Sequence, residues 1–165
     1  MFRKIEDFRK AWEYETESTI KLLNHLTDES LNQKVTENGR SLGFLAWHLV
    51  TTLAEMPGHV GLKIDAPLEG ETPQTIAEIA SAFEKGAKSV SEEVGKNWTD
   101  ETLLQEDNLY GETWTRGETL GYLLVHQTHH RGQITVLMRQ AGLPVSGIYG
   151  PAKEEWQAMG MPAMA

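Results

Sequence analysis

The chain has 165 residues, of which 39% are hydrophobic and 24% are charged, with 15 Gly and 6 Pro. This length fits one domain, and the composition is that of a globular protein rather than a disordered or fibrous one. The formal net charge is −9, and the basic residues are scattered among acidic ones, which argues against nucleic acids and anionic membranes as partners. We therefore expect a single soluble domain over residues 1–165.

The chain contains no Cys. It therefore has no disulfide, thiolate ligand or thiol nucleophile of its own, and any thiol chemistry must come from a substrate. The N-terminus, MFRKIEDFRK, lacks the apolar core of a secretory signal, and the longest nearly uncharged apolar stretch, residues 42–53, is too short to span a membrane. These features predict a cytoplasmic location.

Apolar residues recur every three or four positions over residues 5–26, which predicts an amphipathic helix. The polar stretch over residues 32–40 indicates a connection. Ser41 is placed to cap a second helix, and we expect that helix to end near Pro57, where the backbone loses a hydrogen-bond donor.

Two capping boxes predict where the last two long helices begin. Thr75 with Glu78 opens a third helix that runs toward Trp98, after a linker over residues 64–73. Thr115 and Glu118 repeat the pattern before a long fourth helix that ends at Ala141-Gly142.

The helical period is lost over residues 99–114, and residues 109–114 predict a loop or a small β-hairpin. After the fourth helix, Pro151 suits the first position of a short last helix that extends through Trp156. Four long helices without long strands predict an all-α four-helix bundle, whose helix order the periodicity leaves open.

His126 and His130 lie four residues apart in the predicted fourth helix, so they stand about 40° apart on one face. Such a pair is typical of a metal site, although it also occurs as a hydrogen-bonded surface pair. Apolar neighbours such as Leu124 and Ile134 predict a partly buried segment, where imidazoles without partners are costly. His129 stands about 100° from His130, and we expect it to miss the site.

His48 is the natural third ligand, because it lies within an apolar segment, residues 45–50, of the predicted second helix. A lone His there is typically a hydrogen-bonded core residue, but the pair on another core helix favours ligation. Three neutral imidazoles leave a fourth position open, as in catalytic zinc sites, and nitrogen ligands suit zinc or nickel better than Mg²⁺ or Ca²⁺. His25 and His59 are interpreted as cations at helix C-termini.

These residues resemble the DinB-like (damage-inducible, YfiT-like) metalloenzyme superfamily over nearly the whole chain. The matching segments are His126-x3-His130-Arg131-Gly132-Gln133, Leu137-x-Arg139-Gln140-x-Gly142, Gly147-Ile148-Tyr149-Gly150-Pro151 and the second-helix His48. The resemblance implies an up-down-down-up bundle, usually a homodimer. It also implies that His48, His126 and His130 bind zinc or nickel at one end of the bundle.

The resemblance also suggests a reaction, because some relatives are enzymes that use bacillithiol, mycothiol or glutathione as a low-molecular-weight thiol. We therefore hypothesise a metal-dependent thiol S-transferase that acts on small electrophiles. Two alternatives remain open at this point: a metal-dependent hydrolase, and a non-catalytic metal-binding protein of the stress response.

Several further side chains have two readings each. Glu55, seven residues after His48, is either a base or hydrogen-bond acceptor at the site or an exposed ion-pairing carboxylate. Gln127 and Gln133 are candidates to support the ligands, and Arg131 binds either an acidic thiol or a structural carboxylate. Three aromatic residues line either a pocket or the core: Trp12, Tyr14 and Trp47. No residue is assigned a catalytic role.

Overall fold

The structure is a computed structural model that describes residues 1–68 and 70–162. The long helices are α1 (Ile5–Leu23), α2 (Leu42–His59), α3 (Ile76–Asn97) and α4 (Arg116–Gln140). The shorter elements are η1 (Glu29–Asn32), η2 (Thr102–Leu104), β1 (Glu106–Leu109), β2 (Glu112–Thr115) and η3 (Lys153–Glu155). The predicted all-α bundle, with a small hairpin before its last helix, is confirmed.

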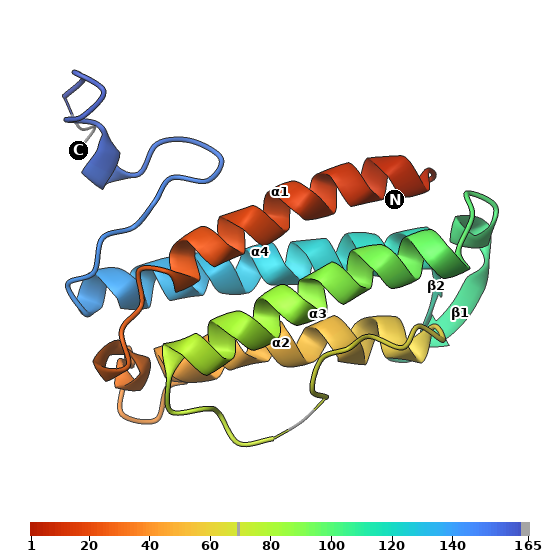
Figure 1. Cartoon of the computed structure of the whole chain (residues 1–165), viewed down its shortest axis with the longest axis horizontal. Helices are drawn as coiled ribbons and strands as arrows, with labels where there is room; N and C mark the ends of the chain where they lie inside the picture. The colour runs from red at the N-terminus through yellow and green to blue at the C-terminus, as the bar shows by residue number, and fades with distance from the viewer. Residues whose placement is uncertain (69, 163–165) are drawn as a thin grey trace.

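The helices run up-down-down-up (Figure 1): α1 and α4 point one way, and α2 and α3 point the other. Each helix packs against two neighbours, so that α1 and α2 lie across the bundle from each other, whereas α2 lies directly against α4. The linker between the parallel helices α2 and α3 therefore crosses back along the bundle. This order makes neighbours of the two helices that carry His48, His126 and His130.

The predicted helix starts agree with the caps. Ser41 Oγ accepts a hydrogen bond from the Phe44 amide at 3.0 Å, and the Thr75 side chain accepts from the amide of Glu78. Thr115 and Glu118 form both halves of a capping box. Each cap satisfies an amide that the first turn of a helix leaves without a partner.

One helix end differs from the prediction, and another lies close to the predicted position. α1 ends at Leu23 rather than at Leu26, because i→i+3 hydrogen bonds close the chain there while Leu26 stays buried. α2 extends two residues beyond Pro57, to His59. Pro57 lies in the last turn, where it removes only its own hydrogen bond and leaves the rest of the helix intact.

The hairpin between α3 and α4 is closed by the two-residue turn Tyr110-Gly111. Leu109 pairs with Glu112 across this turn, and both turn residues have positive φ, +53° for Tyr110 and +85° for Gly111. Such angles are typical of the tight turns that match the twist of a β-hairpin. Gly111 adopts this angle readily, whereas Tyr110 carries a side chain in a region that favours glycine.

The core is formed by apolar side chains from all four helices. Its largest fully buried members include Phe8, Leu22, Leu49, Leu53, Phe83, Leu120 and Leu123. Gly86 allows α3 to approach α2, because a Cβ atom there would lie 2.9 Å from Leu53 Cδ1. Trp12 belongs to this core and donates its indole hydrogen to the Ala87 carbonyl at 2.9 Å. Over residues 1–68 and 70–162, no helix has the length and apolarity needed to cross a membrane.

A buried ion pair joins α4 to α1. Arg131 is 2% exposed and Glu15 is 6% exposed, and their charged groups are in direct contact. Arg131 also donates to the Glu15 carbonyl at 2.8 Å and to Thr19 Oγ1 at 3.1 Å. Of the two readings of Arg131, the structure supports the structural ion pair, because no thiol can reach a guanidinium enclosed in this way.

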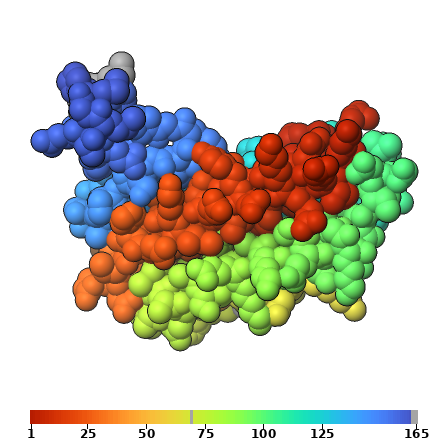
Figure 2. Space-filling model, turned by 45° about the horizontal axis from the view of Figure 1, so that its top comes forward, coloured from red at the N-terminus to blue at the C-terminus, as the bar shows by residue number. Residues whose placement is uncertain are grey.

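The C-terminal segment folds back onto α1 after leaving α4. The Tyr149 hydroxyl lies 2.7 Å from both carboxylate oxygens of Glu15, and His25 Nε2 lies 2.8 Å from Ser146 Oγ. The Tyr14 hydroxyl donates to the Ile148 carbonyl. Beyond these contacts, the chain as far as residue 162 stands out from one end of the bundle (Figure 2) and forms turns and the short helix η3, a 3₁₀ helix that ends one residue before Trp156.

The ion pair predicts a large effect from a small change. Replacing Glu15 with Gln should lower the free energy of unfolding by about 3–5 kcal/mol, because Arg131 would remain buried without its counter-charge. Chemical denaturation followed by circular dichroism measures this quantity. Glu17→Gln, an exposed position on the same helix, is the matched control and should stay within about 0.5 kcal/mol of the wild type. Equal stability of the two variants would contradict the role of the ion pair.

Candidate metal centre

The structure brings His48 of α2 together with His126 and His130 of α4. One ring nitrogen from each histidine lies within 4.8 Å of the other two, so the group could hold a metal ion. The ring centroid of His48 is 4.7 Å from that of His130 and 5.1 Å from that of His126. The Nε2 atoms of His126 and His130 are 3.2 Å apart. The group lies midway along α2 and α4, whereas the family resemblance implied one end of the bundle.

Gln127 fixes how α2 and α4 lie against each other at this level. Its side-chain amide is buried and donates to the Leu49 carbonyl at 3.0 Å and to Thr52 Oγ1 at 3.1 Å. Both acceptors lie on α2, within four residues of His48. Gln127 therefore supports the site by joining the two helices, and it makes no hydrogen bond to the histidines.

Gln133 sets the orientation of His130. The Nδ1 atom of His130 lies 2.7 Å from Gln133 Oε1, and an amide oxygen can only accept, so Nδ1 carries the hydrogen. The lone pair of neutral His130 is then on Nε2, which faces His126. On its other side, the Gln133 amide contacts His129 Nε2 at 3.2 Å. His129 is exposed and lies outside the histidine triad, as expected.

The triad is held in its neutral form. Burial, followed by the charges of His130 and His48, lowers the pKa of His126 to about 4. Burial is also the largest cause that lowers the pKa of His48 and of His130, and the positive charge of Arg40 acts on both in the same direction. Neutral imidazole is the form that coordinates a metal.

The donor set fits a divalent ion. Three neutral nitrogens converge from two rigid helices, and one imidazole is oriented by a hydrogen bond to its other nitrogen, as metal ligands usually are. His126 Nδ1 is buried and has no hydrogen-bond partner among the described residues. The lone pairs of the ring nitrogens that face one another also cost free energy while they lack a partner, and a shared cation compensates for that second cost.

An open pocket of about 520 Å³ lies beside His126. It is lined by Glu55, Met56, Tyr110, Trp114, Tyr122, Val125, His126 and His129. The Tyr110 hydroxyl donates to Glu55 Oε1 at 2.7 Å, and His59 Nε2 is 3.6 Å from the same oxygen. Burial and the Glu55 carboxylate raise the pKa of Tyr110, so its hydroxyl stays protonated. Glu55 thus lines the pocket and also contacts the exposed side chain of His59, so it has features of both readings.

The aromatic wall of this pocket differs from the one expected. Trp12, Tyr14 and Trp47 were the predicted candidates, but none of these three lines the pocket. The wall comes from the hairpin and the start of α4: Tyr110, Trp114 and Tyr122. The only available signal was the concentration of aromatic residues next to a Gly turn before the histidine helix.

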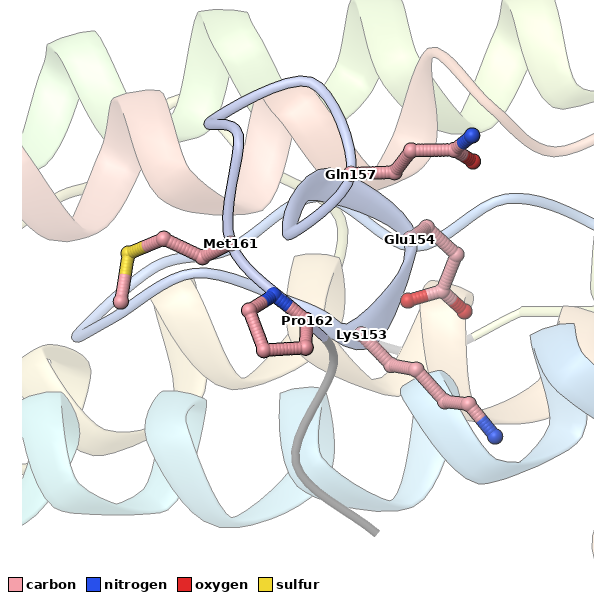
Figure 3. A pocket seen from close by; sticks show the side chains of 5 residues that line it. All are labelled: Lys153, Glu154, Gln157, Met161 and Pro162. Carbon is pink, nitrogen blue, oxygen red and sulfur yellow. The ribbon is translucent and has the colours of Figure 1, made fainter.

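A different pocket, shown in Figure 3, is formed entirely by the C-terminal segment. Its lining side chains are Lys153, Glu154, Gln157, Met161 and Pro162. It shares no residue with the pocket beside His126, and it offers no convergent set of metal ligands. The histidine triad, and not this C-terminal pocket, is therefore the candidate site for metal binding.

Removal of a triad side chain should reduce metal binding. We expect His48→Ala, His126→Ala and His130→Ala each to lower the affinity for zinc or nickel by more than about tenfold. Changes to residues that only support the ligands already cost about tenfold or more, and the loss of a ligand should cost more than that. Equilibrium dialysis followed by elemental analysis gives the affinity. His129→Ala, next to His130 on the same helix, is the control and should keep full metal content. Full metal content in the triad variants would rule out this site.

The lowered pKa of His126 predicts how the metal-free protein responds to acid. In the unfolded chain His126 takes up a proton below its ordinary pKa of 6.5, whereas in the folded chain it does so only near 4. The contribution of neutral His126 to the free energy of unfolding is therefore complete above about pH 6.5, and it is lost as the pH falls toward 4.

Melting temperatures measured from pH 7 to pH 4 test this response. The decline should be shallower in His126→Gln than in the wild type, and the carboxylates that titrate in the same range contribute equally to both. Parallel curves for the two proteins would contradict the prediction.

The chain is similar to known proteins from Bacillus species. The chain is 44% identical over 164 residues to the uncharacterized protein YrdA of Bacillus subtilis (strain 168), covering 99% of this chain and 98% of that protein. A crystal structure of a DinB-like protein from Bacillus cereus ATCC 10987 matches with a TM-score of 0.87 and 41% identity, over 90% of this chain and 100% of that one.

A more distant structure shares the fold. The DinB-like protein YjoA from Bacillus subtilis has a TM-score of 0.66 at 19% identity, over 84% of this chain and 95% of that one. The model of the DinB family matches residues 1–163. Because this match covers nearly the whole chain, the chain belongs to the DinB family.

Proposed function

We propose that the protein is a metal-dependent thiol S-transferase, which joins a low-molecular-weight thiol to a small electrophile. The observation that carries the proposal is the triad of neutral imidazoles, placed beside an open aromatic pocket. We propose His48, His126 and His130 as the ligands and zinc or nickel as the ion, because all three donors are nitrogens. The thiol is a cosubstrate of the bacillithiol, mycothiol or glutathione type, since the chain has no Cys.

The side chains around the triad have separate tasks in this reaction. A divalent ion held there would act as a Lewis acid that lowers the pKa of a coordinating thiol. Gln133 keeps His130 Nε2 directed at the site. Tyr110, Trp114 and Tyr122 provide apolar surface for the electrophile. The thiol gives up its proton to solvent, its sulfur forms the new bond to carbon, and the leaving group departs with the electron pair of the bond that breaks.

A second candidate is a metal-dependent hydrolase, which the position of Glu55 favours. Its carboxylate lines the same pocket as His126, where it could take a proton from an attacking water. The hydrogen bond from Tyr110 holds this carboxylate in place at 2.7 Å. The remaining alternative is a metal-binding protein of the stress response that catalyses no reaction.

The proposal includes a cytoplasmic homodimer. The resemblance to the DinB-like superfamily, whose members are usually homodimers, supports the dimer.

Assays with purified, metal-loaded protein separate the candidates. A transferase should conjugate monochlorobimane with a thiol above the uncatalysed rate, and His130→Ala should lose about 100-fold or more of that rate because a ligand is missing. Glu17→Gln, at an exposed position on α1, is the control and should keep the full rate. The fluorescence of the conjugate gives the rate.

Ester hydrolysis without a thiol tests the second candidate. If the protein is a hydrolase, p-nitrophenyl acetate is cleaved and Glu55→Gln slows this cleavage by about 10²-fold or more. If the protein is a transferase, Glu55→Gln retains most thiol conjugation. Bound metal without turnover of any thiol or ester would support the non-catalytic alternative and contradict both enzymes.

A further inference from the structure

A second pocket, of about 480 Å³, lies on the other side of the histidine triad. Its lining residues are Val35, Gly39, Arg40, Leu45, Gln133, Val136 and Leu137. Leu45 lies about one turn before His48 on α2, and Gln133 lies about one turn after His130 on α4. The pocket beside Glu55 begins on the opposite side of the same histidines. The triad therefore lies between two pockets along the junction of α2 and α4.

Arg40 is the only ionisable residue that lines this second pocket. Its side chain is exposed, and its guanidinium forms no hydrogen bond or ion pair with residues 1–68 or 70–162. By contrast, Arg116 and Arg139 lie 2.9 and 3.1 Å from the carboxylates of Asp107 and Glu154. Arg40 is thus an uncommitted cation on a chain whose formal net charge is −9.

Arg40 contacts the ring of Phe44, which in turn stacks on His48 of the triad. The Arg40 Cζ atom lies 5.0 Å from the ring centroid of Phe44, and the Phe44 ring stacks on His48 with centroids 6.1 Å apart and an interplanar angle of 17°. The guanidinium is therefore no more than about 11 Å from the His48 ring. This cation–π contact with Phe44 holds the Arg40 guanidinium beside the second pocket.

We propose that Arg40 binds a carboxylate of the small molecule whose other end occupies the open coordination position of the triad. This rests on the proposed metal site, but not on thiol chemistry. A guanidinium pairs with a carboxylate through two parallel hydrogen bonds, which fixes the orientation of the ligand as well as its position. The apolar side chains of Leu45, Val136 and Leu137 contact the carbon chain between the two ends.

Each of the two pockets beside the triad then binds a different class of substrate. The pocket with Arg40 takes the acidic metal ligand, which is the thiol if the protein is a transferase. The aromatic pocket with Tyr110 takes the uncharged electrophile. Specificity for an acidic thiol over a neutral one would come from Arg40, a residue outside the triad.

Binding of paired ligands to nickel-loaded protein tests the role of Arg40. N-acetylcysteine and its amide differ at one end, as carboxylate or neutral amide, and the thiolate-to-nickel absorption band reports the binding of either. We expect the wild type to bind the acid about tenfold more tightly than the amide, a factor that corresponds to 1.4 kcal/mol. Arg40→Gln should remove this preference by weakening only the acid.

Two variants serve as controls. Arg40→Lys keeps the charge but loses the paired hydrogen bonds, and should retain part of the preference. Lys88→Gln makes the same change of charge at an exposed position on α3 and should retain all of it. Because the variants are compared with the same two ligands, intrinsic differences between the acid and the amide cancel.

A second pair of ligands separates this proposal from the thiol reaction. Succinic acid monohydroxamate and acetohydroxamic acid both bind nickel through the hydroxamate, and only the first carries a carboxylate; calorimetry measures their binding. If Arg40→Gln removes the preference for this acid while no thiol binds, the Arg40 site stands and the transferase fails. Equal binding of acid and neutral ligand in the wild type, or a preference that persists in Arg40→Gln, overturns the Arg40 site. Failure to take up nickel overturns both proposals.

Discussion

The buried pair of Arg131 and Glu15 is the constraint on which the site depends. Arg131 follows His130 directly, so the two side chains project about 100° apart from α4. Arg131 is held against α1, and four residues earlier Gln127 is held against α2. These two anchors fix the rotation of α4 about its own axis. With that rotation fixed, the face with His126 and His130 is directed at His48.

The surroundings of the triad follow from the antiparallel packing of α2 and α4. The hairpin lies at one side of the histidines and brings aromatic side chains to Glu55. The connection before α2 lies at the other side and brings Arg40. Rigid helices therefore supply the three imidazoles, whereas the segments between helices supply Tyr110 and Arg40, the groups that we propose contact small molecules. Substrate preference in such a bundle can change while the ligands stay in place.

Most of the fold was predictable from local signals. Ser41, Thr75 and Thr115 mark helix starts because each cap acts on amides two or three residues away. Local signals also indicated the triad. These signals are the spacing of His126 and His130 along one helix and the apolar residues around His48. Tyr110 and Arg40 were missed because their importance comes from contacts across the bundle. The partner of Arg131 was equally hidden, since Glu15 lies 116 positions away.

Tyr110 shows a conflict between local and functional requirements. A two-residue turn with positive φ at both positions is formed at least cost by Asn and Gly, and Tyr110 occupies the first of these positions. In return, its ring forms part of the pocket wall and its hydroxyl holds Glu55. Selection for stability alone would replace this tyrosine. A relative with Asn or Gly at this position would form the turn at lower cost in free energy, but it would lack both the aromatic ring on this side of the pocket and the hydrogen bond to Glu55.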